Sequence, residues 1–162
     1  MFAPMDSKIA EAKREVEQIE QAAKSADSFM RRIVKLLHDR MLKYNWVGFY
    51  MLEPGVHAPT LVLGPFEGAV TPHTHIPLNQ GICGAAAAGG ETLVVDDVSQ
   101  DSRYLACSLE TQSEIVVPIF VHGKVVGELD IDSHFPAAFA KEDRELLEYC
   151  AFLVGRQLEK NN

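Results

Sequence analysis

The residues with the clearest chemical potential lie between positions 104 and 133, in the stretch YLACSLETQSEIVVPIFVHGKVVGELDIDS. Cys107 lies seven residues before Glu114, and Asp130 and Asp132 follow near the end of the stretch. A thiolate is a strong nucleophile, and grouped carboxyl groups can bind a cation or transfer protons. The stretch therefore predicts one site that combines a nucleophile with three acids.

A β-hairpin is predicted to position these acids. Residues 114–121 and 124–132 are rich in Val and Ile, and the His-Gly pair between them suits a tight turn. Side chains alternate between the two faces of a strand, so Asp130 and Asp132 share a face. Because Glu114 opens the neighbouring strand, the thiol and the acids can line one end of a sheet.

Two further cysteines lie in predicted helices. Cys83 is in the first turn of a small-residue helix at residues 81–90, GICGAAAAGG. The N–H groups and dipole at a helix N-terminus stabilise a thiolate, which would make Cys83 more acidic than an ordinary cysteine. A second interpretation is that Cys83 is a small buried hydrophobic residue. Cys150 lies on the apolar stripe of a predicted helix at residues 141–162, which favours an inert thiol.

The composition indicates one domain and argues against several partners. The chain of 162 residues is 47% hydrophobic, enough for one core, so residues 1–162 are interpreted as a single domain. The net charge of −8 and the lack of a basic stripe argue against a nucleic-acid partner. No apolar run is long enough to span a membrane, and the N-terminus is too charged for a signal peptide. We therefore expect a cytoplasmic protein, in which three cysteines favour free or redox-active thiols over structural disulfides.

The order of the remaining elements predicts the fold class. Within residues 1–26 a narrow apolar stripe suits a helix at a homodimer interface, and it equally suits packing on the helix's own domain. A second helix from about residue 27 has the broader apolar face of a core element. Strands are predicted at residues 46–52, 60–66 and 91–97 before the hairpin. These elements predict an α+β domain, with an antiparallel β-sheet of about five or six strands and helices packed on one face.

This series of motifs resembles the GAF domain family. The resemblance runs from about residue 27 to residue 158 and rests on NWVGFY, LVLGPF, GICG, EIVVPI, GELDIDS and FAKED. Within the family the chain is most similar to the free methionine-(R)-sulfoxide reductases, because a GICG cysteine, a cysteine 24 residues later, and the segments SEIV and LDID occur together. The resemblance implies a GAF-like sheet and an enzyme that uses a thiol to reduce free methionine-(R)-sulfoxide to methionine.

The resemblance also implies roles for individual residues. It makes Cys107 the catalytic nucleophile. It implies that the substrate is bound by Trp46, Tyr50, Glu114, Asp130 and Asp132. No bound cofactor is implied, and the reductant would be thioredoxin or a similar thiol protein.

The implied reaction suits these residue types. A free amino acid sulfoxide carries an ammonium group, which carboxylates can bind, and a polar S=O group, which a protonated acid can polarise. Acids that lie close together raise one another's pKa and so favour one protonated form. A sulfenic acid formed on Cys107 would then condense with a second thiol.

One position departs from the family pattern. The family usually has a third cysteine ten residues before the GICG cysteine, and this chain has His73 there. An arginine frequent two residues later is replaced by His75. The third cysteine commonly resolves the oxidised nucleophile. That role therefore falls to Cys83 or to an outside thiol, and Cys83 is predicted as the second catalytic cysteine.

Other functions are less well supported by the sequence. Zinc accepts the residue types of His73, His75, Cys83 and Cys107, but no pair has the short spacing of structural zinc sites, so no metal site is predicted. No cysteine is followed by histidine, the pair through which many GAF domains attach a bilin, and no phosphate-binding glycine loop is present. The alternative function is a stand-alone GAF sensor or binding module for a small metabolite. A binding module does not need two cysteines, which favours the enzyme.

Overall fold

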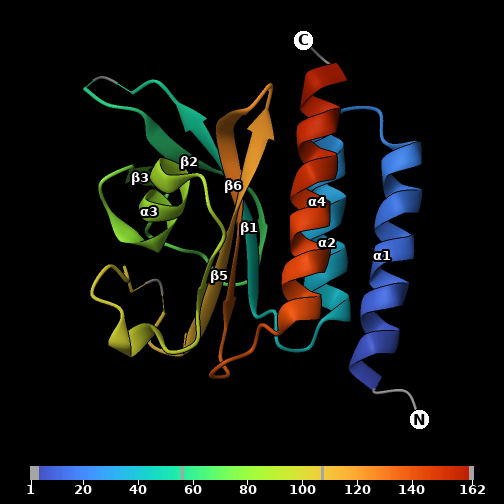
Figure 1. Cartoon of the computed structure of the whole chain (residues 1–162), viewed down its shortest axis with the longest axis horizontal. Coiled ribbons are helices and arrows are strands. Elements are labelled where there is room, and N and C mark those ends of the chain that lie inside the picture. The colour runs from blue at the N-terminus through green and yellow to red at the C-terminus, as the bar shows by residue number, and fades with distance from the viewer. Residues whose placement is uncertain (1–3, 56, 107, 161–162) are drawn as a thin grey trace.

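The computed structural model describes residues 4–55, 57–106 and 108–160 (Figure 1). Cys107, the predicted nucleophile, lies outside the described residues. The helices are α1 (Pro4–Ala22), α2 (Ala26–Arg40), α3 (Gly81–Gly89), the 3₁₀ helix η1 (Val98–Gln100) and α4 (Lys141–Lys160). The strands are β1 (Trp46–Glu53), β2 (Thr60–Glu67), β3 (His75–Pro77), β4 (Leu93–Val95), β5 (Ser113–Val121) and β6 (Lys124–Ser133).

Six strands form one antiparallel sheet in the order β3-β2-β1-β6-β5-β4. The predicted hairpin is β5–β6. Its turn residues His122 and Gly123 both have positive φ, 51° and 77°, as the favoured two-residue hairpin turn requires. β6 is central, between β5 and β1. The predicted α+β class with an antiparallel sheet is confirmed.

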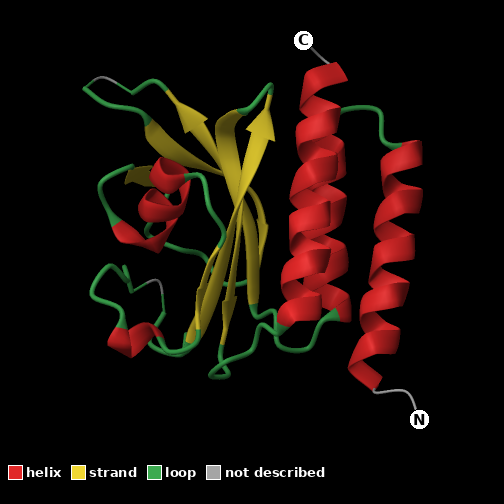
Figure 2. Cartoon of the chain, viewed as in Figure 1, coloured by secondary structure: helices red, strands yellow, loops and turns green. Residues whose placement is uncertain are grey.

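The three long helices lie on one side of the sheet (Figure 2). α2 and α4 pack directly on the sheet, and α1 lies outside them. Alternation along the strands gives this face apolar side chains, including the fully buried Val47, Phe49, Leu129 and Ile131. Burying each such side chain stabilises the fold by about 1.5–3 kcal/mol. This face is therefore the main hydrophobic core.

The apolar stripe of α1 packs within the chain. Ala12, Val16 and Ile19 are buried in the cluster that α1 shares with α2 and α4. The hydroxyl of Tyr149 on α4 donates to Glu17 Oε2 at 2.9 Å. Of the two interpretations of the stripe, packing on its own domain is the one observed, and a role of this helix in a homodimer stays a prediction.

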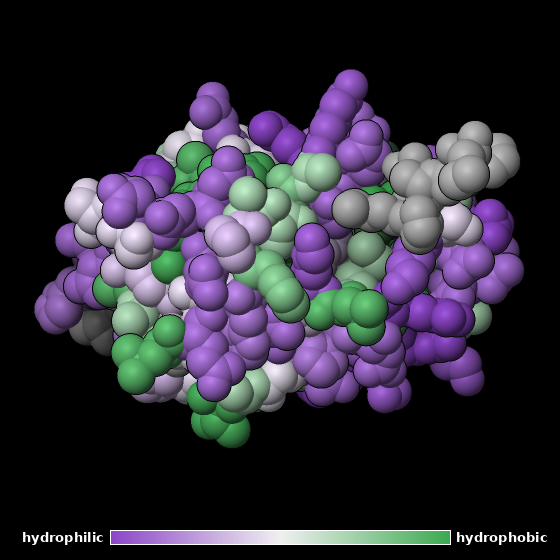
Figure 3. Space-filling model, turned by 90° about the horizontal axis from the view of Figure 1, so that it is seen from below, coloured by the Kyte–Doolittle hydropathy of each residue, from purple (hydrophilic) through white to green (hydrophobic). Residues whose placement is uncertain are grey.

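The surface is largely hydrophilic, in keeping with the net charge of −8. On the side seen in Figure 3, hydrophobic residues form small groups among hydrophilic ones. Among the described residues, no helix has both the length and the apolar character needed to cross a membrane.

The opposite face of the sheet carries α3, η1 and several long loops (Figure 2). A second hydrophobic cluster joins Trp46 and Tyr50 of β1, Val116 of β5 and residues of α3. The predicted acids of β5 and β6 share this face, because they alternate with the residues that face the long helices. The sheet thus separates an apolar core from a face where polar groups are buried beside aromatic rings.

The strand predicted at residues 91–97 is shorter in the structure. β4 ends at Val95, because Asp97 turns the chain into η1, where its Oδ1 accepts the Ser99 N–H at 3.0 Å. The acids Asp96 and Asp97 at the end of the predicted strand therefore stay outside the sheet.

Candidate functional site

The register of β5 and β6 places four acids together. Glu114 of β5 pairs with Asp132 of β6, and Asp130 and Glu128 follow along β6 at intervals of two residues. Residues two apart in a strand share a face, so all four side chains lie on the side of α3. We call Glu114, Glu128, Asp130 and Asp132 the acid cluster.

The acid cluster is buried and has no cationic partner among the described residues. Each of its residues has an exposed fraction of 4% or less. No ion pair within the described part of the chain involves these carboxyl groups. Asp130 Oδ1, Asp132 Oδ1 and both oxygens of Glu128 are buried without a hydrogen-bond partner among the described residues. Because buried polar groups are normally hydrogen-bonded, this arrangement points to a ligand that carries positive charge or donors.

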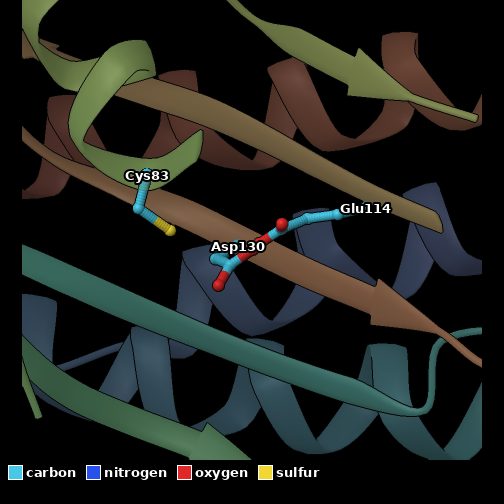
Figure 4. Close-up of side chains that lie close together, drawn as sticks. All are labelled: Cys83, Glu114 and Asp130. Carbon is cyan, nitrogen blue, oxygen red and sulfur yellow. The ribbon is translucent and has the colours of Figure 1, made fainter. Parts of the chain in front are cut away.

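Cys83 reaches the acid cluster from α3. Its Sγ and a carboxylate oxygen from each of Glu114 and Asp130 all lie within 4.8 Å of one another. In Figure 4 the thiol points from α3 toward the two strands, and the two carboxyl groups point toward each other. The structure therefore brings together three predicted site residues that come from three different elements.

Burial and mutual repulsion raise the pKa of the acids. The pKa of Glu114 lies well above its usual range because of burial and then because of the charges of Asp130 and Asp132. Burial raises the pKa of Asp132 in the same way, with the charge of Asp130 adding to it, and burial raises that of Asp130. Higher pKa values favour protonated carboxyl groups, which can donate hydrogen bonds.

The predicted acidity of Cys83 is wrong. Burial raises the pKa of its thiol well above the ordinary value, and the charges of Asp130, Glu128 and Glu114 raise it further. The N-terminal dipole of a nine-residue helix does not offset desolvation beside several carboxyl groups. Cys83 is therefore a buried neutral thiol. The inert interpretation of Cys150 fits its burial, which raises its pKa to about 12.

The two predicted aromatic residues lie on β1 beside the acids. Trp46 pairs with Asp132 and Tyr50 with Glu128 across the β1–β6 register. Between them, Gly48 makes room for the indole: a Cβ at Gly48 would lie 2.2 Å from the ring of Trp46. The indole thus lies over Gly48, which pairs with Asp130 in the middle of the acid cluster.

Both aromatic side chains also fix the loop that precedes β3. Trp46 Nε1 donates to Ala69 O at 3.0 Å, and the Tyr50 hydroxyl donates to His73 O at 2.7 Å. These bonds tie residues 68–74 to β1, so the loop forms a wall next to the acids.

A cavity of about 340 Å³ opens beside the acid cluster. Trp46 and Asp132 line it from the sheet, residues 68–71 line it from the loop before β3, and Ser108 lines it from the loop before β5. Asp132 is the member of the acid cluster that forms its wall. The cavity therefore gives a small molecule access to Asp132 at the edge of the acid cluster.

Ala106 and Ser108, the two neighbours of Cys107 in the chain, lie near His73 and the cavity. Ser108 lines the cavity, and Ala106 O accepts a hydrogen bond from His73 Nε2 at 3.1 Å. His73 thus anchors the loop that carries Cys107. His75 lies at the start of β3, where its Nδ1 is 3.0 Å from Thr74 Oγ1.

Two residues of the site are missed by the sequence prediction. Glu128 is fully buried in the acid cluster, and Gly48 accommodates the indole of Trp46. A signal for Glu128 is present in the sequence, because it shares strand parity with Asp130 and Asp132. No comparable signal exists for Gly48, whose role depends on a contact within the folded strand.

The first prediction concerns Glu128 and pH. Burial raises its pKa well above the ordinary 4.5, and the charge of Asp130 adds to the shift. Above pH 4.5 the unfolded chain releases a proton that the folded chain retains, so this group lowers stability as pH rises, by up to about 1.4 kcal/mol per pH unit. Glu128→Gln should therefore unfold at a higher urea concentration than wild type at pH 8, with the difference shrinking toward pH 5.

Urea denaturation of both proteins at pH 5, 6, 7 and 8 measures this difference. Glu91→Gln, at an exposed position with no ion pair among the described residues, serves as the matched control and should not change the pH dependence. A stability difference between Glu128→Gln and wild type that stays constant with pH would contradict the raised pKa.

The sequence and the structure are both similar to those of known proteins. The GAF domain family matches residues 25–158. A free methionine-R-sulfoxide reductase of Escherichia coli is 41% identical over 125 residues, which are 77% of this chain and 70% of that protein. The structure is similar to a type II free methionine-R-sulfoxide reductase of Thermoplasma acidophilum (TM-score 0.78, 39% identity, 88% of this chain and 96% of that chain). It is also similar to the free methionine-R-sulfoxide reductase of Neisseria meningitidis in complex with its substrate (TM-score 0.89, 31% identity, 98% of this chain and 93% of that chain).

Proposed function

The chain belongs to the GAF domain family, and we propose that it reduces free methionine-R-sulfoxide to methionine with Cys107 as the nucleophile. The observation that carries this proposal is the buried acid cluster, which lies beside a cavity and next to the loop that holds Cys107. Relatives with this activity, similar over most of the chain, support it.

The acid cluster suits the amino group of a free amino acid. An ammonium ion entering past Asp132 would supply the positive charge that the described residues do not provide. A methionine sulfoxide within a peptide has no free amine, so the buried carboxyl groups would remain uncompensated, which disfavours its binding. The site therefore selects free amino acids. The indole of Trp46 offers an apolar wall for the methylthio end of the substrate.

The chemistry needs one protonated acid and one thiol. The carboxyl group of Glu114, whose pKa is raised by burial, donates a hydrogen bond to the sulfoxide oxygen and polarises the S=O bond. The sulfur of Cys107 attacks the substrate sulfur, and the oxygen passes to Cys107. The sulfoxide is reduced to methionine by two electrons, and the thiol is oxidised to a sulfenic acid.

Regeneration needs a second thiol. The sulfenic acid condenses with the thiol of Cys83 or of an outside protein, forming a disulfide and releasing water. A thioredoxin-type protein then reduces the disulfide by thiol exchange and becomes oxidised itself. This sequence balances the two electrons that the substrate accepts and needs no bound cofactor.

A coupled assay tests the function. Wild-type protein with thioredoxin, thioredoxin reductase and NADPH should consume NADPH when free methionine-R-sulfoxide is added. The free S isomer and a peptide containing methionine sulfoxide serve as matched controls and should give much slower consumption. If the protein binds the free sulfoxide in calorimetry but releases no methionine even with dithiothreitol, the stand-alone sensor becomes the better account.

The second prediction concerns Asp132, which lines the cavity. Asp132→Asn removes a charge that would pair with the substrate ammonium, and KM should rise by at least about tenfold, since a buried hydrogen-bonded charge pair contributes 2–5 kcal/mol. Stability should not fall, because the raised pKa of Asp132 shows that its charged form opposes folding. Kinetics and thermal melting measured on the same sample separate the two effects. A large loss of melting temperature with unchanged KM would identify Asp132 as structural.

A further inference from the structure

We propose that Cys83, Glu114 and Asp130 also form a binding site for a divalent cation that accepts thiolate ligands, such as Zn²⁺. This ion would compete with the free amino acid for the acid cluster. The binding site is inferred from the geometry alone. The competition rests on the proposed function.

The three side chains have ligand atoms of suitable kind and spacing. They come from α3, β5 and β6, and Sγ and the two carboxylate oxygens lie within 4.8 Å of one another. Zinc bonds of about 2.0–2.3 Å in a tetrahedron place ligand atoms roughly 3.3–3.8 Å apart. Side-chain rotations of about 1 Å would therefore close the site around an ion. Figure 4 shows the three side chains converging from opposite sides of one small volume.

Independent support comes from carboxylate oxygens without partners. Asp130 Oδ1 and both oxygens of Glu128 are buried and have no hydrogen-bond partner among the described residues. Glu128 lies near enough to Cys83 for its charge to act on the thiol. A divalent cation at Cys83 would compensate this negative charge.

The thiol determines which cation is favoured. Mg²⁺ and Ca²⁺ prefer oxygen ligands only, whereas Zn²⁺ accepts a thiolate together with carboxylates. Binding would displace the proton of Cys83, as metal binding to a cysteine does generally. The two positive charges of the ion would offset two of the three negative charges of the thiolate and the two carboxylates, which lowers the cost of burying them.

The metal site adjoins the cavity through one residue. The cavity reaches Asp132, and Asp132 pairs with Glu114 in the β5–β6 register. The ion would therefore use carboxyl groups of the same acid cluster that would bind the substrate ammonium. Occupancy would remove the thiol of Cys83 and the carboxylates of Glu114 and Asp130 from the reaction together.

Cobalt(II) tests the site directly, because a thiolate ligand gives it a charge-transfer absorption. The reduced full-length chain is titrated with Co²⁺, and Zn²⁺ is then added. We expect one equivalent to bind with thiolate-to-cobalt absorption, and Zn²⁺ to displace it. Cys83→Ser should lose the absorption, while Cys107→Ser and the control Cys150→Ala should keep it. Asp130→Asn should weaken binding by at least about tenfold.

The cobalt titrations test the metal site and the competition separately. No absorption with wild type, or absorption that depends on Cys107 and not on Cys83, would overturn the site. Circular dichroism melting checks every variant, and Glu114→Gln replaces Cys83→Ser if that variant does not fold. In Cys107→Ser, which would bind the sulfoxide without being oxidised by it, free methionine-R-sulfoxide should raise the apparent Kd of Co²⁺, and equal affinity with and without it would overturn the competition. A chain that binds cobalt through Cys83 but releases no methionine keeps the metal site and refutes the proposed function, and the reverse result refutes only the metal site.

Discussion

Cys107→Ser should abolish the release of methionine from free methionine-R-sulfoxide, already in the first turnover and by at least about 10³-fold. A hydroxyl group is a far weaker nucleophile than a thiolate. Its oxygen also cannot accept the sulfoxide oxygen without forming an unstable O–O bond, whereas sulfur forms a sulfenic acid. Single-turnover experiments with enzyme in excess, quenched and analysed by chromatography, measure the methionine released.

Substrate binding provides the control for this loss. Because the acid cluster and the cavity wall formed by Trp46 are unchanged in the variant, calorimetry should give a Kd for the sulfoxide close to that of wild type. Cys150→Ala, on the buried side of α4, should release methionine as fast as wild type. Release at the wild-type rate by Cys107→Ser would move the nucleophile elsewhere, with Cys83 as the next candidate.

The sequence predicts those parts of the site that follow from local rules. The hairpin turn at His122-Gly123 and the shared face of Asp130 and Asp132 depend only on turn chemistry and on strand alternation, and both are found in the structure. The same alternation extends to Glu128, which could have been included on that ground. Local patterning is thus sufficient to place most of the acid cluster.

The remaining features depend on contacts between distant segments. Trp46 and Tyr50 lie beside the acids because β1 pairs with β6, about eighty residues later in the chain, and only the family resemblance indicates this in advance. The acidity predicted for Cys83 fails for the same reason. The helix end is visible in the sequence, but the carboxyl groups that surround the thiol come from β5 and β6.

Replacing Cys83 should separate the first turnover from the later ones. The loop before β5 and α3 already touch: Leu105, two residues before Cys107, packs on Gly81, two residues before Cys83. Gly81 permits this contact because its φ is 72° and a Cβ there would lie 2.9 Å from Leu105 Cδ1. A disulfide needs Cα atoms within about 7 Å, and this contact holds together the two segments that carry the cysteines. We expect oxidation by one equivalent of substrate to yield a Cys83–Cys107 disulfide.

The Cys83→Ser variant tests the role of this disulfide. Cys83→Ser should release the first methionine at the wild-type rate and slow further turnovers with thioredoxin by at least about tenfold, since the sulfenic acid then lacks an internal thiol. Peptide mass spectrometry after alkylation identifies the disulfide in wild type and its absence in the variant. Cys150→Ala again serves as the matched control, because its thiol is buried in the opposite core.

The raised pKa of Cys83 gives this step a pH dependence of known sign. The attacking species is the thiolate, and burial among carboxyl groups keeps Cys83 protonated at neutral pH. Disulfide formation should therefore accelerate as pH rises from 6 to 9, while release of the first methionine, which depends on a protonated acid of the cluster, should not accelerate in parallel. Stopped-flow and quench measurements on one preparation follow the two steps separately. A disulfide step independent of pH, or an unchanged turnover rate in Cys83→Ser, would assign resolution of Cys107 to an outside thiol.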